Sequence, residues 1–95
     1  MTGEIVRFAC PCCGHRTITD TFDICPVCSW EHDPVQEADP EDAGGPNRVG
    51  LRQAQRNFAT IRASDPKSVA RVRPPKDDEP LDPAWKPLDP SSDES

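Results

Sequence analysis

The residues that decide the fold, Cys10 to Cys28, read CPCCGHRTITDTFDICPVC. They contain two C-x2-C pairs, Cys10 with Cys13 and Cys25 with Cys28, each with a proline after its first cysteine. Proline presets a tight turn, and the glycine after Cys13 permits a left-handed backbone angle. Two such turns, here called knuckles, direct four thiolates to one centre with the tetrahedral geometry of structural zinc. The sequence therefore predicts that these four cysteines bind one metal ion.

Zinc is the metal that we expect at this site, but four thiolates in the same knuckles also bind iron, so the sequence leaves iron open. Disulfides fit less well, because five cysteines are an odd number and the N-terminus has no apolar run typical of a signal peptide. A thioredoxin-like redox motif would need a βαβ pattern, which the sequence lacks. These features predict a cytoplasmic protein with reduced thiols.

Composition gives an independent reason to expect a metal. The chain has 95 residues, of which 34% are hydrophobic and 5% aromatic, and it contains 12 prolines. So small and polar a chain buries too little apolar surface to be held by packing alone. No apolar stretch is long enough to span a membrane, so we expect no membrane association.

Four other residues near the cysteine pairs could bind the metal or pack around it. Cys12 lies at the tip of the first knuckle, and we expect its thiol to point away from the metal and to pack in the turn. A reactive thiol or an alternate ligand is the other interpretation. Four thiolates already fill a tetrahedron, so His15 and His32 are expected at the surface. Trp30 is predicted to shield the metal or to fill the core.

Short strands are expected beside the metal. Residues 4–9 are rich in strand-forming types. Residues 17–24 place Ile18, Phe22 and Ile24 at even spacing, which predicts one face of a strand or hairpin. Together the two segments predict a sheet of two or three strands.

One amphipathic helix is predicted over residues 51–63, LRQAQRNFATIRA, which contain neither glycine nor proline. Leu51, Ala54, Phe58 and Ile61 share one face of that helix. We expect Leu51, Phe58 and Ile61 on this face to pack on the cysteine-containing unit, near Trp30 and Phe22. The following residues, 67–73, are ambiguous between a strand and a turn of helix.

The fold predicted is a small metal-stapled α+β protein. A zinc-ribbon-like hairpin with rubredoxin-type knuckles precedes one amphipathic helix and a disordered acidic tail. The tail prediction follows from composition, since six prolines and seven acids share the last 22 residues. The expected segments are a four-cysteine unit (1–34), an acidic, glycine-containing loop (35–50), the helix with its extension (51–75) and the tail (76–95).

Two functions are compatible with these features. The first is a protein-interaction module of unknown partner, in which the metal is structural. A site closed by four cysteines has no open position for water, and no nucleophile and base are assembled, so we expect no enzyme activity. The alternative is a nucleic-acid-associated protein. Arg48, Arg52 and Arg56 would form a stripe for phosphate contacts if the helix begins early enough to include Arg48.

Charge favours the first function. The net charge is -6, although residues 48–73 carry seven bases and a single acid. The flanking segments are acidic, and the chain has no tyrosine for base stacking. We therefore expect a protein partner rather than a nucleic acid.

Several motifs in order resemble the bacterial family called cysteine-rich CPCC proteins. The resemblance implies a small zinc-binding domain with Cys10, Cys13, Cys25 and Cys28 as ligands, in a family with no established activity. The motifs are FACPCCGHRTI (8–18), FDICPVCSWEHDPVQ (22–36), GLRQAQRNFATI (50–61) and VRPP (72–75).

The chain departs from the family pattern at a few positions. Ser29 stands where the family often has an aromatic residue, and His32 where an acid is common. Gly50 replaces the expected serine cap, which weakens the start of the helix. The acidic segment after Pro75 looks like an addition specific to this member.

Overall fold

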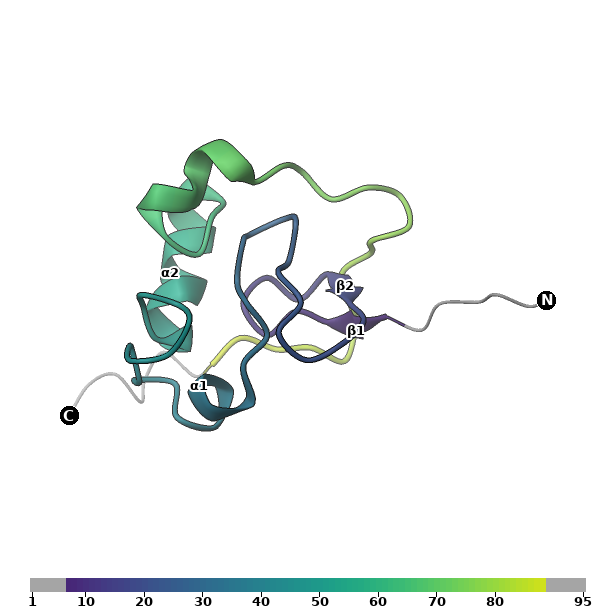
Figure 1. Ribbon diagram of the computed structural model, residues 1–95. Helices are drawn as coiled ribbons and strands as arrows, with labels where there is room; N and C mark the ends of the chain where they lie inside the picture. Colours follow the sequence, from purple (N-terminus) through teal and green to yellow (C-terminus); the bar gives the residue numbers. More distant parts are fainter. Residues whose placement is uncertain (1–6, 89–95) are drawn as a thin grey trace.

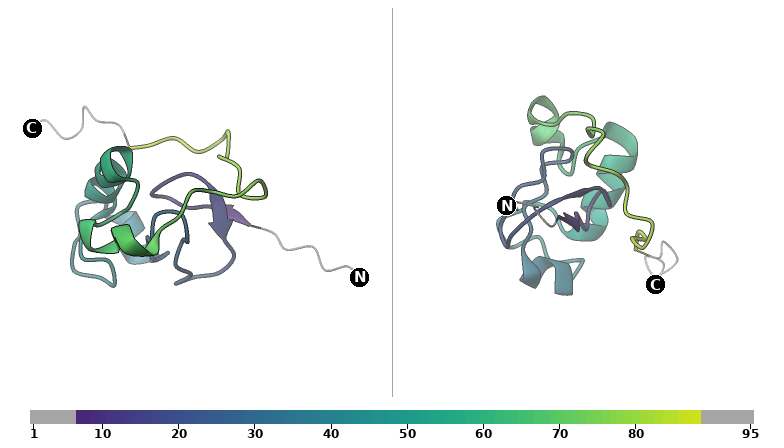
Figure 2. Two further views of the ribbon diagram at one scale, coloured as in Figure 1. Left: turned by 90° about the horizontal axis from the view of Figure 1, so that it is seen from above. Right: turned by 90° about the vertical axis from the view of Figure 1, so that its right-hand side faces the viewer.

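The computed structural model describes residues 7–88 and places two cysteine-containing hairpins beside one principal helix (Figure 1). Two further views show that the helices lie together on one side of these hairpins (Figure 2). In chain order the elements are β1 (Phe8–Ala9), β2 (Arg16–Ile18), α1 (Pro34–Ala38), α2 (Leu51–Ile61) and the 3-10 helix η1 (Pro66–Arg71).

The first hairpin contains the predicted strands in shorter form. β1 and β2 pair antiparallel, with Phe8 opposite Ile18, and they form a two-stranded sheet. The turn between them is the first knuckle, where the N–H of Cys10 donates to the carbonyl of His15 at 2.8 Å. Gly14 has φ +82°, the left-handed angle for which glycine was expected.

The prediction that Ile18, Phe22 and Ile24 lie on one face of a strand or hairpin is wrong, because β2 ends at Ile18. Ile18 is 1% exposed, whereas Phe22 and Ile24 are 57% and 60% exposed. The chain leaves β2 after Ile18 and turns, and the Asp23 carboxylate accepts the N–H of Asp20 at 2.9 Å. Phe22 has φ +69°, so side chains in this turn no longer alternate as they do along a strand.

The acidic loop predicted over 35–50 contains a short helix, α1, that the sequence analysis missed. Asp33 caps it by accepting the N–H of Gln36 at 3.0 Å, and Pro34 occupies its first turn. Gln36 is fully buried. Its side-chain amide donates to the carbonyls of Asp42 (2.8 Å) and Asn47 (3.1 Å), so it organises the loop from inside.

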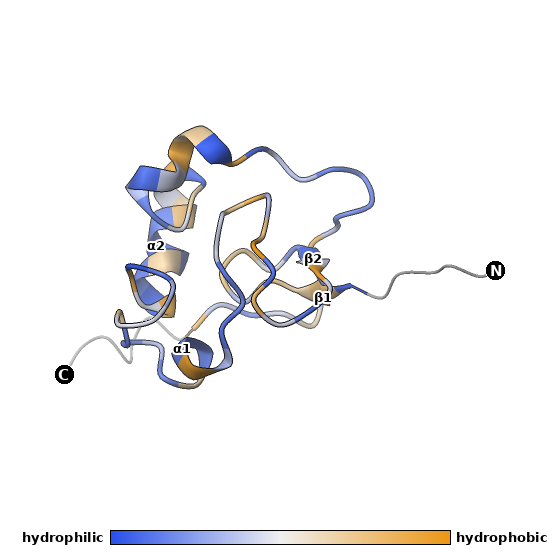
Figure 3. Ribbon diagram, viewed as in Figure 1, coloured by the Kyte–Doolittle hydropathy of each residue, from blue (hydrophilic) through white to orange (hydrophobic). Residues whose placement is uncertain are grey.

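α2 confirms the predicted helix and ends two residues early, because Arg62 takes a left-handed angle with φ +61°. Its ribbon alternates hydrophobic and hydrophilic colours (Figure 3). Leu51, Ala54 and Phe58 belong to one core cluster with the knuckle cysteines and Trp30, as expected. Ile61 lies at the rim and is 36% exposed. The exposed position of Phe22 contradicts the expected contact between Phe22 and α2.

The prediction of disorder over 76–95 is wrong for residues 76–88, which we call the strap. The strap runs back along the first hairpin toward the start of α2 (Figure 1). Its backbone extends the hairpin, since Arg16 donates to Pro80 at 3.0 Å and Asp82 donates to Gly14 at 2.9 Å. Trp85 donates to the carbonyl of Pro11 at 3.1 Å. Residues 89–95 of the predicted tail lie outside the described residues.

Residues 67–73, which the sequence left ambiguous, are helical as far as Arg71 and belong to η1. Asp65 caps η1 by accepting the N–H of Lys67 at 3.0 Å. Across residues 7–88, no helix combines the length and the apolar character that crossing a membrane requires.

Candidate metal centre

Four cysteine sulfurs surround one point between the two knuckles. The Sγ atoms of Cys10, Cys13, Cys25 and Cys28 all lie within 4.8 Å of one another. Cys10 and Cys28 are 3.5 Å apart, and Cys13 and Cys25 are 3.7 Å apart. A disulfide would need about 2.05 Å. Zinc–sulfur bonds of about 2.3 Å give a tetrahedron with edges of about 3.8 Å. The spacing therefore fits four ligands around one metal ion.

The two knuckles hold their cysteines by the same backbone pattern. In the first, Gly14 donates to the carbonyl of Cys10 at 2.7 Å. In the second, Ser29 donates to the carbonyl of Cys25 at 2.7 Å, and Cys25 donates to Trp30 at 2.9 Å. Both Gly14 and Ser29 have positive φ, +82° and +74°. The repeated C-P-x-C spacing thus produces two equivalent turns that face each other.

The cluster is closed to solvent. The exposed fractions of the four cysteines are between 0% and 3%, and Trp30 and Ile18 beside them are 0% and 1% exposed. Thr17 donates its hydroxyl to Cys25 Sγ at 3.0 Å, which favours the thiolate form of that cysteine. No spacing in the sequence singles out Thr17, so the sequence analysis missed it.

A cation would stabilise these four cysteines in their ionised form. Burial raises the pKa of the Cys10 thiol, and the hydrogen bond with Cys10 raises the pKa of Cys28. Hydrogen bonds from the neighbouring thiols, that of Cys10 first, lower the pKa of Cys25. Four thiolates buried together without a positive charge would repel one another strongly. A divalent cation removes that penalty and releases the thiol protons.

The remaining candidates lie outside the four-sulfur cluster. Cys12 is 1% exposed. Its sulfur is not one of the four that lie together, and its side chain packs in the core cluster with the other knuckle cysteines. His15 and His32 are half-buried rather than on the surface. Their Nδ1 atoms lie 2.8 Å from the Glu79 carbonyl and from the Glu37 carboxylate respectively.

Trp30 fills the core, and its Nε1 donates to Glu37 at 3.0 Å. This arrangement agrees with one of the two roles predicted for it. Glu37 was not recognised from the sequence, although it lies on α1 at a spacing that lets one carboxylate reach both Trp30 and His32.

The three arginines of the alternative function do not form the expected stripe. α2 begins at Leu51, so Arg48 lies before the helix. The Arg48 guanidinium makes a two-pronged contact with Asp65, at 2.7 and 2.9 Å, and holds the pKa of that carboxyl at about 2. Arg52 pairs with Glu41, while Arg56 lies on α2 one turn further along.

Comparison with known proteins agrees with the geometry of this centre. A search of curated proteins gave no match. The family model described as "Cysteine-rich CPCC" matches residues 8–79, which include both knuckles, α2 and η1. Most of the strap lies beyond the matched residues. Because the match covers well over half of its length, this chain belongs to the cysteine-rich CPCC family.

Proposed function

We propose that this protein is a non-enzymatic protein-interaction module built around one structural zinc ion. The observation that carries the proposal is the closure of the site, since all four cysteine side chains are buried. A metal with four thiolate ligands has no open position for water or substrate. Its contribution is then to stability, and the function belongs to the surface that the metal holds in place.

Zinc is proposed over iron because the site is small, closed and tetrahedral, and because no group near it suggests electron transfer. The five cysteines are free thiols in the structure. Thiols stay reduced in the cytoplasm, so five free cysteines support the proposal that the protein works there.

A protein partner is supported by the turn that presents Phe22. This aromatic side chain is 57% exposed at φ +69°, an angle that costs a bulky residue roughly 1–2 kcal/mol. The turn is nevertheless fixed, since the N–H of Phe22 donates to His32 at 2.7 Å. A rigid aromatic side chain held in solvent is the type of residue that anchors protein interfaces.

Nucleic-acid binding is a weaker proposal. Arg48 and Arg52 are each paired with a carboxylate, and Arg48 is not on the helix. A phosphate backbone would have to compete with those carboxylates for the same guanidinium groups.

The metal proposal is tested by elemental analysis of purified protein. We expect about one zinc per chain in the wild type, as in other structural zinc sites. Cys25→Ser should lose the metal and unfold, whereas Cys12→Ser should keep it. Iron in place of zinc, or loss of metal from the Cys12 variant, would contradict this assignment.

The partner proposal is tested by capture from native lysate. Tagged wild type and Phe22→Ser should be compared with Val35→Ser, an equally exposed control on α1 that is 67% exposed. A partner should be retained by the wild type and the control, and lost with Phe22→Ser or after chelation. Equal capture by all forms would show that the Phe22 turn is not the interface.

A further inference from the structure

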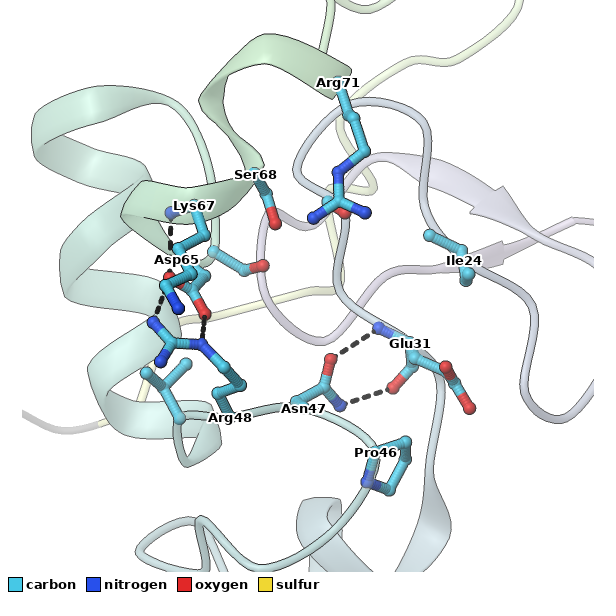
Figure 4. A pocket seen from close by; sticks show the side chains of 12 residues that line it. Ile24, Glu31, Pro46, Asn47, Arg48, Asp65, Lys67, Ser68 and Arg71 are labelled. Carbon is cyan, nitrogen blue, oxygen red and sulfur yellow. Dashed lines mark hydrogen bonds and ion pairs between the residues drawn. The ribbon is translucent and has the colours of Figure 1, made fainter.

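A cavity of about 200 Å³ lies beside the second knuckle, where Ser29 lines it. The second knuckle, the loop before α2 and η1 border this open cavity (Figure 4). Besides Asn47, the lining side chains that can donate hydrogen bonds are those of Ser29, Arg48, Ser64, Lys67, Ser68 and Arg71.

Positive charge exceeds negative charge around this cavity. Three bases line it, against the two acids Glu31 and Asp65. Asp65 is already neutralised by Arg48 and also accepts the backbone N–H of Lys67. Within residues 7–88, the side chains of Lys67 and Arg71 have no ion-pair partner. Figure 4 shows the Arg71 guanidinium reaching down from η1 toward the space above Asn47.

Hydroxyl groups lie below these charges. Ser64 and Ser68 are 3% and 7% exposed, and neither hydroxyl makes a hydrogen bond to another part of residues 7–88. No buried side-chain oxygen in that range is sealed from solvent without a partner, so both hydroxyls are reachable from the cavity. Unpaired donors beneath unpaired cations are suited to an anion with several acceptor oxygens.

The walls of the cavity are fixed by hydrogen bonds that a ligand need not disturb. Asn47 spans the gap to the second knuckle, accepting the N–H of Glu31 at 2.8 Å and donating to its carbonyl at 2.9 Å. Ser64 donates its N–H to Cys28 at 2.7 Å. The site is therefore preformed, and the cost of ordering it on binding is low.

We propose that this cavity binds a phosphate monoester. Its volume equals that of roughly six to seven liquid waters, enough for a phosphoryl group and the atoms that carry it, and below the usual 300–1,000 Å³ of drug-sized ligands. A phosphate monoester brings close to two negative charges and three acceptor oxygens. Lys67 and Arg71 match the charges, and Ser64 and Ser68 match the oxygens. This site is distinct from the metal centre and from the Phe22 turn, so the inference goes beyond the proposed function.

The test is a titration of the metal-loaded full chain, followed by amide and arginine side-chain NMR shifts at constant ionic strength. The probes are inorganic phosphate, O-phosphoserine, a phosphoserine peptide and acetate. We expect saturable shifts at Ser64, Ser68 and Arg71 with a millimolar or lower dissociation constant for the phosphates. Acetate should bind at least ten-fold more weakly, since it has fewer oxygens and less charge.

Variants separate a built site from general attraction to positive charge. Arg71→Gln and Ser68→Ala should each weaken phosphate binding, by about ten-fold or more for the arginine. Lys86→Gln, a matched change at an exposed lysine of the strap, should leave it unchanged. Tighter binding of the peptide than of O-phosphoserine would identify a phosphorylated protein as the source, and equal binding a small phosphorylated molecule. Unsaturable shifts, equal binding of acetate, or equal effects of the Arg71 and Lys86 changes would overturn the proposal.

Discussion

Gly14→Ala tests whether the strap is part of the fold. Gly14 has φ +82°, where a residue with a Cβ is disfavoured by roughly 1–2 kcal/mol. A Cβ at this position would lie 2.4 Å from Cε3 of Trp85 and 2.9 Å from Cδ1 of Leu81. Ring carbons do not approach a methyl group so closely, and the ring of Trp85 cannot bend. The substitution must therefore displace Trp85 from the first knuckle.

The expected cost follows from these two effects. Truncation of a buried Trp costs about 3–5 kcal/mol, and Trp85 is only half-buried, so we expect about 2 kcal/mol for Trp85→Ala. In the intact chain, Gly14→Ala should lose this contact and add the backbone strain, about 3–4 kcal/mol altogether. In a Trp85→Ala background, the same change should cost only the strain, about 1–2 kcal/mol.

Guanidinium unfolding of the wild type, both single variants and the double variant, at one fixed free zinc concentration, measures this coupling. The two changes should be sub-additive by about 2 kcal/mol. Gly44→Ala is the control, because its Cβ would meet nothing nearer than Asp42 Oδ1 at 3.2 Å, and it should cost far less. Additive effects of the Gly14 and Trp85 changes would refute the placement of the strap over the first knuckle.

Three further predictions concern the core, the loop and acid stability. Phe58→Ala should lower the free energy of unfolding by about 3–5 kcal/mol, measured in the same way; an unchanged value would mean that α2 does not pack on the knuckles. Gln36→Met should lower the free energy of unfolding by about 2–4 kcal/mol, because it leaves loop carbonyls and the N–H of Asn47 buried without partners. An unaltered amide spectrum of the loop would contradict this prediction. Arg73 lowers the pKa of Glu79 from 4.5 to about 2. The ion pair therefore adds about 2 kcal/mol to the free energy of unfolding, after allowing for solvent screening. This stabilisation is complete above about pH 4.5 and is lost as the pH falls toward 2. Glu79→Gln should therefore be less stable than wild type at pH 6 and should converge with it in acid, whereas Asp78→Asn, at an exposed ion pair, should follow the wild-type curve.

The cluster of four cysteine sulfurs was predictable from the sequence, because local backbone geometry determines where they point. A C-P-x-C turn directs its two sulfurs to one side whatever surrounds it, and two such turns separated by a short hairpin must face each other. The helix was predictable for a similar reason, since Leu51, Ala54 and Phe58 mark a face that only a helix aligns. Its early end was not, because the left-handed angle of Arg62 has no signal in composition.

The strap was missed because disorder was judged from composition alone. Residues 76–88 contain few apolar groups, and on average such segments cannot recover the entropy of ordering. Here the hairpin edge supplies backbone partners for Pro80 and Asp82, as an added strand does at an open sheet edge. The remaining contacts are the indole of Trp85 against Gly14 and a partly buried ion pair between Arg73 and Glu79 at 2.8 Å. These contacts depend on long-range proximity, which no local pattern contains.

The same contacts explain how an acidic protein keeps an open cationic cavity. Among the acids of the strap, residues 76–88, Glu79 pairs with a base of the segment 48–73, Arg73 at its end. Asp78 pairs with Arg7 and Asp82 with Arg16, both near the first hairpin. The strap thus places its negative charge over the first knuckle, while Lys67 and Arg71 lie beside the second. The two knuckles are alike in backbone, and the cavity beside the second, lined by Lys67 and Arg71, is where we propose that an anionic ligand binds.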